Sequence, residues 1–461
     1  MGDVKKAGSI LIISHEIVGQ CMAGPGIRYF HLARILSREF DVTLAIPNKV
    51  SANFDDVPFQ IKSYQQQDWA SIESLVNLAS VVIFPSDIAS NFPQLAESEA
   101  SLVVDGYDPL LAEWLATRQT CQTEEELSCW QSRMLSLHQQ YLIGDFFICA
   151  SERQRTWWLG LLEANGRINP WVFHEDRSLR SLVDVVPYGF PEAVPEHTHA
   201  VVKGVWPGIG VEDKVILWGG GLWPWLDPLT AIRAVALVWE KRQDVRLIFP
   251  GTRHPNPQMK EISTYTEDAL QLALDLDLLD KAVFFGDWVP YADWPNVLLE
   301  SDIALTLHFD TIETQLAFRS RLLDYIWVGL PVVAARGDAT SDLVADYGLG
   351  KVVDYEDAAG VAEAILELLD GASGDMHVNF ERARQALSWE RAAEPLVRFC
   401  RSPRRAPDRR ALGAALGNPF HVEAQSRLAA ERDYWQNLAK RYEQGRFMRF
   451  MRWIHGLRGR D

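Results

Sequence analysis

The sequence has 461 residues, of which 48% are hydrophobic, so its length and composition favour two folded domains with large cores and exclude a disordered chain. The net charge of −17 argues against a nucleic-acid-binding protein. The five cysteines are scattered and form no CxxC pair, which argues against a zinc site or a disulfide framework.

The N-terminal region begins with a short apolar run, residues 9–14, that Ser14, His15 and Glu16 interrupt before any cleavage site for a signal peptide. No apolar run reaches the roughly 18 residues of a membrane span. We therefore interpret the run as a buried first strand and expect a cytoplasmic protein.

The first half of the chain alternates short apolar runs with segments of helical periodicity. The runs predict strands at residues 9–14, 41–47, 81–85, 102–106 and 146–151, with a helix at 27–40 after the first. This order is typical of a parallel sheet covered by helices on both faces. A Pro- and Gly-rich segment that runs from a strand into a loop, residues 183–193, marks the exit from a first Rossmann-like domain that we place at residues 1–195.

The pattern restarts near residue 214 and predicts a second domain of the same kind at residues 205–395. Strands are expected at 214–220, 245–251, 282–288, 302–307 and 331–335, and helices near 228–241, 258–276, 291–300 and 316–328. Two doubly wound domains in tandem place a cleft between the carboxyl ends of their sheets, where ligands bind in such folds.

Two glycine-containing loops are candidate anion sites. Gly26 and Arg28 follow the first strand, and Gly220 and Gly221 follow the first strand of the second domain. Backbone amides at a helix start, with a nearby cation, bind phosphate well. The alternative for each loop is an ordinary strand–helix turn. Neither loop has the GxGxxG pattern of a nicotinamide-binding site.

The segment 302–338 is the richest in polar side chains. His308 ends a predicted strand, Glu313 lies in the following loop, and a helix presents Arg319, Arg321 and Asp324. Arg321 and Asp324 share a helix face. An arginine pairs bidentately with a diphosphate, and a carboxylate accepts hydrogen bonds from ribose hydroxyls. The alternative is a solvated Arg–Asp pair.

This segment resembles the signature region of family 4 retaining glycosyltransferases, which have the GT-B fold, and the resemblance covers most of residues 9–395. FRSRLLDYIWVGLPVVA is similar to the family's helix that ends in a carboxylate before Gly-Leu-Pro-Val-Val. The resemblance implies that Asp324 binds the donor ribose. FFGDWVPYADWPNVLLESDIALT resembles the family's nucleobase-binding region, which implies that Trp288 and Val289 lie near the base.

The sequence also departs from the family pattern. Leu316 stands eight residues before Asp324, where the family usually has a glutamate, so Glu313 is the expected substitute. The second glycine loop lacks the Arg and Lys that usually hold the diphosphate, so Arg319 or Arg321 is expected to supply this charge.

The expected activity is transfer of a sugar, with retention, from a nucleoside-diphosphate sugar to a glycan or lipid-linked acceptor in cell-surface polysaccharide synthesis. The expected catalytic residues are Glu313, His308 and Asp105. The expected donor-binding residues are Gly26, Arg28, Gly220, Gly221, Trp288, Val289, Arg319, Arg321 and Asp324. His15 and Asp108 are expected on the acceptor side, and neither a cofactor nor a metal is expected. Structural roles are the alternative for both histidines, and a turn cap is the alternative for Asp105.

Three other functions fit the same pattern. A sugar-nucleotide epimerase and a glycogen-type phosphorylase share the fold, but the phosphorylase needs a cofactor lysine and residues 302–338 contain none. A catalytically inactive binding protein for glycan assembly is the third, because the glutamate expected at Leu316 is missing.

The C-terminal region, residues 401–461, is basic, with 14 Lys and Arg against 6 Asp and Glu, a net of +8. Residues 402–419 predict a linker. Residues 420–461 predict helices with aromatic residues and arginines, a composition typical of an interfacial helix. We expect this tail to dock on a membrane surface, at the inner face of the cytoplasmic membrane, or on a membrane-bound partner. The alternatives are packing on the acidic body or pairing with another subunit.

Overall fold

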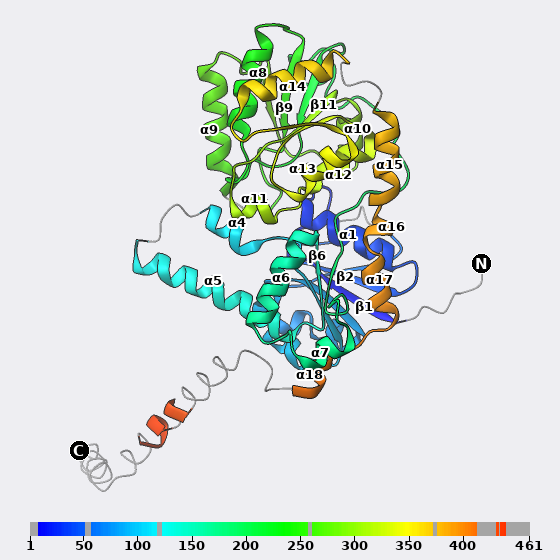
Figure 1. The fold of residues 1–461 in the computed structure, drawn as a ribbon, viewed down its shortest axis with the longest axis vertical. Coiled ribbons are helices and arrows are strands. Elements are labelled where there is room, and N and C mark those ends of the chain that lie inside the picture. Colours follow the sequence, from blue (N-terminus) through cyan, green and yellow to red (C-terminus); the bar gives the residue numbers. More distant parts are fainter. Residues whose placement is uncertain are drawn as a thin grey trace, which may run out of the picture.

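The computed structural model describes residues 8–50, 57–117, 122–256, 261–371, 376–412, 430–432 and 434–438. Two α/β domains lie one above the other, each with a parallel sheet between layers of helices (Figure 1). This arrangement confirms the predicted pair of doubly wound domains. Of the predicted basic tail, the described residues beyond 412 are two short helical pieces, and the rest of 413–461 lies outside the described residues.

The first domain holds a seven-stranded parallel sheet in the order β3-β2-β1-β4-β5-β6-β7. Its strands are β1 (Ser9–Ile13), β2 (Asp41–Ile46), β3 (Gln60–Ser63), β4 (Val81–Pro85), β5 (Ser101–Asp105), β6 (Phe146–Cys149) and β7 (Val183–Val185). The central strands β4, β5 and β6 are buried along their whole length, because helices cover both faces. Edge strand β3 is largely exposed and lacks an apolar run, which is why the sequence did not predict it.

The helices of the first domain are α1 (Gly24–Leu36), α2 (Glu73–Leu78), α3 (Ile88–Asn91), α4 (Leu110–Ala116), α5 (Glu124–Ile143), α6 (Glu152–Ala164) and α7 (Pro170–Glu175), with 3-10 turns at Trp69–Ser71 and Pro93–Glu97. Helix α5 starts with a full capping box between Thr123 and Glu126. Together α4 and α5 extend to one side of the domain (Figure 1).

The second domain holds a six-stranded parallel sheet in the order β10-β9-β8-β11-β12-β13. Its strands are β8 (Lys214–Trp218), β9 (Val245–Pro250), β10 (Val283–Gly286), β11 (Ile303–Thr306), β12 (Val332–Ala335) and β13 (Gly350–Val353). Its helices are α8 (Pro228–Trp239), α9 (Glu261–Asp275), α10 (Trp294–Leu299), α11 (Ile312–Leu316), α12 (Ser320–Val328), α13 (Ala339–Tyr347), α14 (Ala358–Leu369) and α15 (His377–Leu387). The sequence predicted every strand of this sheet except β13.

The chain returns to the first domain after α15, through α16 (Trp389–Ala392) and α17 (Glu394–Arg401) (Figure 1). Trp389 stacks on His31 of α1 with ring centroids 5.3 Å apart, and Phe399 stacks on Phe146 of β6 at 4.7 Å. The predicted boundary at residue 395 therefore lies inside a segment that packs on the first domain.

Part of the predicted linker is also fixed on the first domain. Helix α18 (Pro407–Leu412) packs against α7. Asp408 is fully buried and accepts hydrogen bonds from Arg167 at 2.7 and 3.2 Å, while Arg409 pairs with Asp145 at 2.8 Å. Residues 402–412 thus form a docked extension of the first domain rather than a free linker.

The two sheets set the position of the site. In each sheet the strand order reverses at one point, between β1 and β4 and between β8 and β11. Crevices at such switch points, outside the carboxyl ends of the strands, bind ligands in open α/β sheets. The loops that follow these four strands carry most of the polar side chains described next.

Candidate functional site

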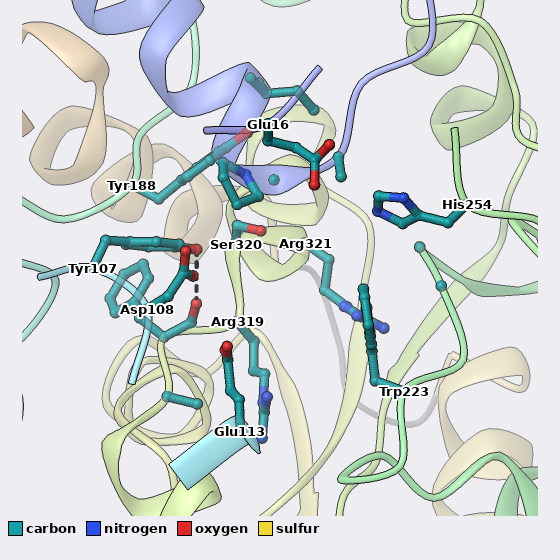
Figure 2. Close-up of a pocket in the computed structure, with 18 of the residues that line it drawn as sticks. Glu16, Tyr107, Asp108, Glu113, Tyr188, Trp223, His254, Arg319, Ser320 and Arg321 are labelled. Atoms are coloured by element: carbon teal, nitrogen blue, oxygen red, sulfur yellow. Dashed lines mark hydrogen bonds between the residues drawn. The ribbon is translucent and has the colours of Figure 1, made fainter. Parts of the chain in front are cut away.

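A cavity of about 390 Å³ lies between the two domains. Its walls come from loops after β1, β4 and β5 and from α4 and α5 of the first domain, and from loops after β8, β9, β10 and β11 and from α12 of the second. Figure 2 shows charged and aromatic side chains from both domains directed into this space. The cavity is the candidate active site.

The glycine loop after β8 forms one wall. Gly220 has a φ of +99°, a left-handed backbone conformation that glycine adopts without strain. The amide of Gly219 donates to the hydroxyl of Tyr325 at 3.0 Å, whereas the amides of Gly220 and Gly221 donate to no group in the described part of the chain. Two amides without a partner at a cavity wall can bind an anion.

Arg321 lies directly beside this loop. A Cβ atom added at Gly220 would lie 3.4 Å from the Arg321 guanidinium, whose central carbon is 6.0 Å from the centre of the Trp218 ring. Arg321 forms no ion pair with any described residue. Burial lowers the pKa of Arg321 from its ordinary value, and the neighbouring Arg319 lowers it further. Arg321 is thus a buried positive charge without an ion-pair partner in the described part of the chain.

Arg319, in contrast, is neutralised within the protein. Its guanidinium donates to both carboxylate oxygens of Glu313 at 2.7 Å, and its Nε lies 3.4 Å from Asp338. Both Glu313 and Arg319 are buried at the edge of the cavity. Because its charge is already paired, Arg319 is a weaker candidate than Arg321 for holding the diphosphate, and Glu313 is not a free carboxylate.

Asp324 lies one turn after Arg321 on α12 and also lines the cavity. Its carboxylate accepts a hydrogen bond from Trp294 Nε1 at 3.0 Å. Burial raises the pKa of Asp324 to about 7, although Trp294 and Arg321 act in the opposite direction. Trp288 and Val289, from the loop after β10, line the same part of the cavity, and Trp288 Nε1 donates to the carbonyl of Met22 at 3.2 Å.

The first domain contributes an acidic wall. His15 and Asp108, the residues expected on the acceptor side, line the cavity, and His15 Nδ1 lies 3.6 Å from Asp87. Burial raises the pKa of Asp108 to about 7; His15 lowers it and Asp105 raises it. Glu113 of α4 lies beside Arg319 (Figure 2), and burial, Asp108 and Glu313 all raise the pKa of its carboxyl well above the ordinary value.

Arg28 and Asp105 do not line the cavity. Their side chains are fully buried and form a bidentate ion pair, with nitrogen–oxygen distances of 2.7 and 3.1 Å. Arg28 also donates to the carbonyls of Val186 and Pro187. This placement does not support the predictions of a donor-binding Arg28 and a catalytic Asp105, because each group already has its partner inside the domain.

Gly26 and His308 also have structural roles. A Cβ atom at Gly26 would lie 2.4 Å from the carbonyl oxygen of Ile17, so glycine is required there by packing and not by a phosphate. His308 is 1% exposed, and its Nε2 lies 3.0 Å from the carbonyl of Arg336. Burial lowers the pKa of His308 to about 4. Neither residue lines the cavity, so the structure does not support either site prediction.

Several cavity residues were not predicted: Glu16, Tyr107, Glu113, Arg133, Tyr188, Trp223, His254 and Ser320. His254 and Trp223 follow strands β9 and β8, so their place at the carboxyl edge of the sheet was a usable signal. Arg133 lies in the middle of α5, and nothing in its sequence neighbourhood distinguishes it from a surface arginine.

No group of three or more His, Cys, Asp or Glu side chains that could hold a metal ion occurs among the described residues. Metal independence stays a prediction. Within the same residues, no helix is both long enough and apolar enough to span a membrane.

A family model matches most of the second domain. Residues 213–371 match the family model of glycosyl transferases group 1. None of the curated proteins matches the sequence.

The fold is similar to that of several solved structures. HepE of Anabaena, with UDP and glucose bound, has a TM-score of 0.63 at 14% identity over 86% of this chain and 100% of that chain. Sucrose-phosphate synthase of Thermosynechococcus elongatus has a TM-score of 0.60 at 14% identity, over 86% and 98% of the two chains. WaaG, a glycosyltransferase involved in lipopolysaccharide biosynthesis, has a TM-score of 0.58 at 14% identity, over 86% and 100%. The chain thus has the predicted GT-B fold, and its residues 213–371 are similar to the glycosyl transferases group 1 family.

Proposed function

We propose that the protein transfers a sugar from a nucleoside-diphosphate sugar to a glycan or lipid-linked acceptor, and that it does so in the cavity between its domains. One observation carries this proposal. Arg321, which forms no ion pair within the described ranges, and the carboxylate of Asp324 lie on one helix beside the open amides of the Gly220 loop. This combination offers a cation, two amide donors and a hydroxyl acceptor to a single ligand.

The diphosphate of the donor binds Arg321 and the amides of Gly220 and Gly221. Negative charge grows on the leaving phosphate as the glycosidic bond breaks, so groups already aimed at it stabilise the transition state by about 3 kcal/mol each. Arg321 is well suited to this role, because a buried cation without a counter-ion gains most from a dianionic ligand.

The nucleoside extends from the diphosphate toward Asp324 and Trp288. Asp324 accepts hydrogen bonds from the ribose hydroxyls, and its ionised form is favoured when Arg321 and the ligand hydroxyls solvate it. Trp288 and Val289 offer an apolar surface to the base. The identity of HepE as a protein that binds UDP and UDP-glucose supports a nucleotide sugar as donor.

The acceptor approaches from the first domain. Asp108, His15 and Glu113 line that wall, and their oxygen and nitrogen atoms are suited to orient hydroxyl groups. We propose retention of the anomeric configuration, and a role in polysaccharide synthesis at the cytoplasmic side of a membrane, on the basis of the resemblance to family 4. The involvement of WaaG in lipopolysaccharide biosynthesis supports the proposed role in polysaccharide synthesis.

A panel of UDP-, GDP-, ADP- and dTDP-sugars tests the proposal directly. Release of the nucleoside diphosphate that increases when a glycan acceptor is added indicates transfer, and NMR of the product gives its anomeric configuration. Conversion of the donor without an acceptor would instead favour an epimerase. Binding of the nucleotide without turnover would favour an inactive assembly protein. The assay is repeated with EDTA, which the proposal predicts to leave turnover unchanged.

A further inference from the structure

His254 lies in the cavity but has no role in the interactions described above. It belongs to the loop between β9 and α9, and its imidazole ring is directed into the cavity between Glu16 and Arg321 (Figure 2). The backbone N–H of Asn256 donates to His254 Nδ1 at 3.1 Å. Because Nδ1 accepts this bond, the neutral ring carries its hydrogen on Nε2. Nε2 is therefore a donor, and no described group accepts from it.

Aromatic neighbours fix the plane of the ring. Trp223 meets it edge-on, with centroids 5.6 Å apart at 65°, and Trp288 does so at 5.1 Å and 69°. Trp223 is itself stacked on Trp225 at 5.0 Å and 6°. These contacts, with the Asn256 bond, hold the ring in one orientation, so its N–H is positioned before any ligand binds.

The glycine loop at residues 217–228 contains no Lys or Arg, so this wall of the cavity lacks a second positive group to accompany Arg321. A diphosphate presents more acceptor oxygens than one guanidinium and two amides can satisfy. His254 follows β9, which lies beside β8 in the sheet, and so its ring borders the same space as the glycine loop.

We propose that His254 is a second ligand of the donor diphosphate, acting opposite Arg321 as a neutral hydrogen-bond donor through Nε2. The proposal rests on the proposed function, because it takes the diphosphate to bind at Arg321. His254 would be a diphosphate ligand from a third element, the loop between β9 and α9, in addition to those from the glycine loop and from α12.

The charged groups around His254 agree with a neutral ring. Arg321 faces it across the cavity, and Arg253 beside it is exposed and lies 3.6 Å from Asp287. Glu16 favours the protonated form, but burial dominates and lowers the pKa of His254 below its ordinary value. In addition, a proton added to Nδ1 would displace the N–H of Asn256. The ring consequently stays neutral near pH 7 and donates without a change in charge.

The test is a calorimetric titration of UDP, GDP and ADP into the full-length protein, with the tightest-binding nucleotide used for the variants. His254→Ala removes the donor and is expected to weaken binding about tenfold, the usual loss for one hydrogen bond to a charged group. His254→Gln keeps an N–H donor and an oxygen that accepts from Asn256, and is expected to bind within about threefold of the unsubstituted protein. His174→Ala, an exposed histidine outside the cavity, is the control and is expected to bind normally.

A second readout separates a ligand from a structural residue. In ¹⁵N NMR of the histidine-labelled protein, His254 is expected to show the neutral Nε2–H form both free and bound, with its Nε2–H resonance shifted by the nucleotide. Protonation of the ring on binding, or normal affinity in His254→Ala, would overturn the proposal for His254. If no nucleotide bound the unsubstituted protein, or if Arg321→Ala had no effect, the proposed function itself would fail.

Discussion

Arg28 and Asp105 form a fully buried bidentate ion pair that connects α1 to the end of β5, while Asp108, three residues later, faces the cavity. Two carboxylates of one short segment therefore have different roles. Removing one partner of a buried pair leaves a charge without compensation, which costs about 3–5 kcal/mol.

We expect Asp105→Asn to lower the free energy of unfolding by about 3 kcal/mol, since Arg28 stays buried without its counter-ion. Asp108→Asn is the matched comparison. Because burial raises the pKa of Asp108 to about 7, its charge is unfavourable in the folded state near pH 8, and its removal is expected to leave stability unchanged or higher. Urea unfolding of both variants measures the difference. Equal stability of the two variants would contradict the assignment of Asp105 to structure.

Glu313 holds Arg319 at the cavity edge, so Glu313→Gln is expected to reduce turnover strongly while nucleotide affinity changes little. The amide can accept only one of the two hydrogen bonds from Arg319 and does not neutralise it, whereas Arg321, the proposed diphosphate ligand, is untouched. Steady-state kinetics and calorimetry on the same preparation separate these effects. Gln315→Ala, an exposed position on the same helix, is the control. Normal turnover in Glu313→Gln would show that the ion pair only stabilises the loop.

The buried carboxyl group of Asp324 is expected to make the free energy of unfolding of the protein depend on pH. Its pKa in the folded protein, about 7, lies above its value in the unfolded chain. The folded protein therefore binds more protons than the unfolded chain between about pH 4 and 7, and the free energy of unfolding falls as the pH rises through this range. Above it, the ionised carboxylate destabilises the fold. Asp324→Asn is therefore expected to raise the free energy of unfolding by about 1–2 kcal/mol near pH 8 and to have no effect below about pH 4.

The same substitution is expected to weaken nucleotide binding, because an amide accepts from ribose hydroxyls less strongly than a carboxylate. A variant that is more stable but binds more weakly is the signature of a ligand-binding group. Denaturation at several pH values, together with calorimetry, checks both parts. A loss of stability near pH 8 would mean that Asp324 is a structural partner of Trp294.

The basic tail remains predicted to bind anionic membranes. Full-length protein is expected to float with anionic vesicles at low salt, and a chain ending at residue 412 is expected not to, since each basic side chain near the surface contributes about 1 kcal/mol. The truncation keeps Asp408, whose loss would leave Arg167 buried without its counter-ion. Equal thermal stability of the two chains is the control. Failure of the full-length protein to float would point to packing on the body or on another subunit.

The sequence predicted the architecture because each buried parallel strand is a short apolar run, which is visible without knowing its neighbours. Edge strands β3 and β13 lack such a run and were not predicted. The direction in which a side chain points was harder to predict from the sequence than the strands were. Arg28 follows a glycine loop, as a phosphate ligand would, but its partner Asp105 lies 77 residues away and the pairing becomes visible only in the fold.

In the candidate site, too, the sequence did not show which side chains pair with each other. Arg319 and Arg321 are two residues apart on one helix start, and the sequence offered both as diphosphate ligands. The contact of Arg319 with Glu313 and Asp338 separates them, and that contact depends on the turn between α11 and α12. His15, Asp108, Trp288 and Asp324 do line the cavity, because each follows a strand or lies on the helix that the family resemblance identified, and their roles there stay predictions.

The most direct test of the account is the affinity of Arg321→Ala for nucleoside diphosphates, measured by calorimetry beside Arg321→Lys and the exposed control Arg398→Ala. Loss of one hydrogen-bonded charge costs about 1.5–3 kcal/mol, so Arg321→Ala is predicted to bind at least about tenfold more weakly, and Arg321→Lys to recover part of the loss. Arg398→Ala is predicted to bind normally. Unchanged affinity in a folded Arg321→Ala protein would contradict the placement of the diphosphate in this cavity.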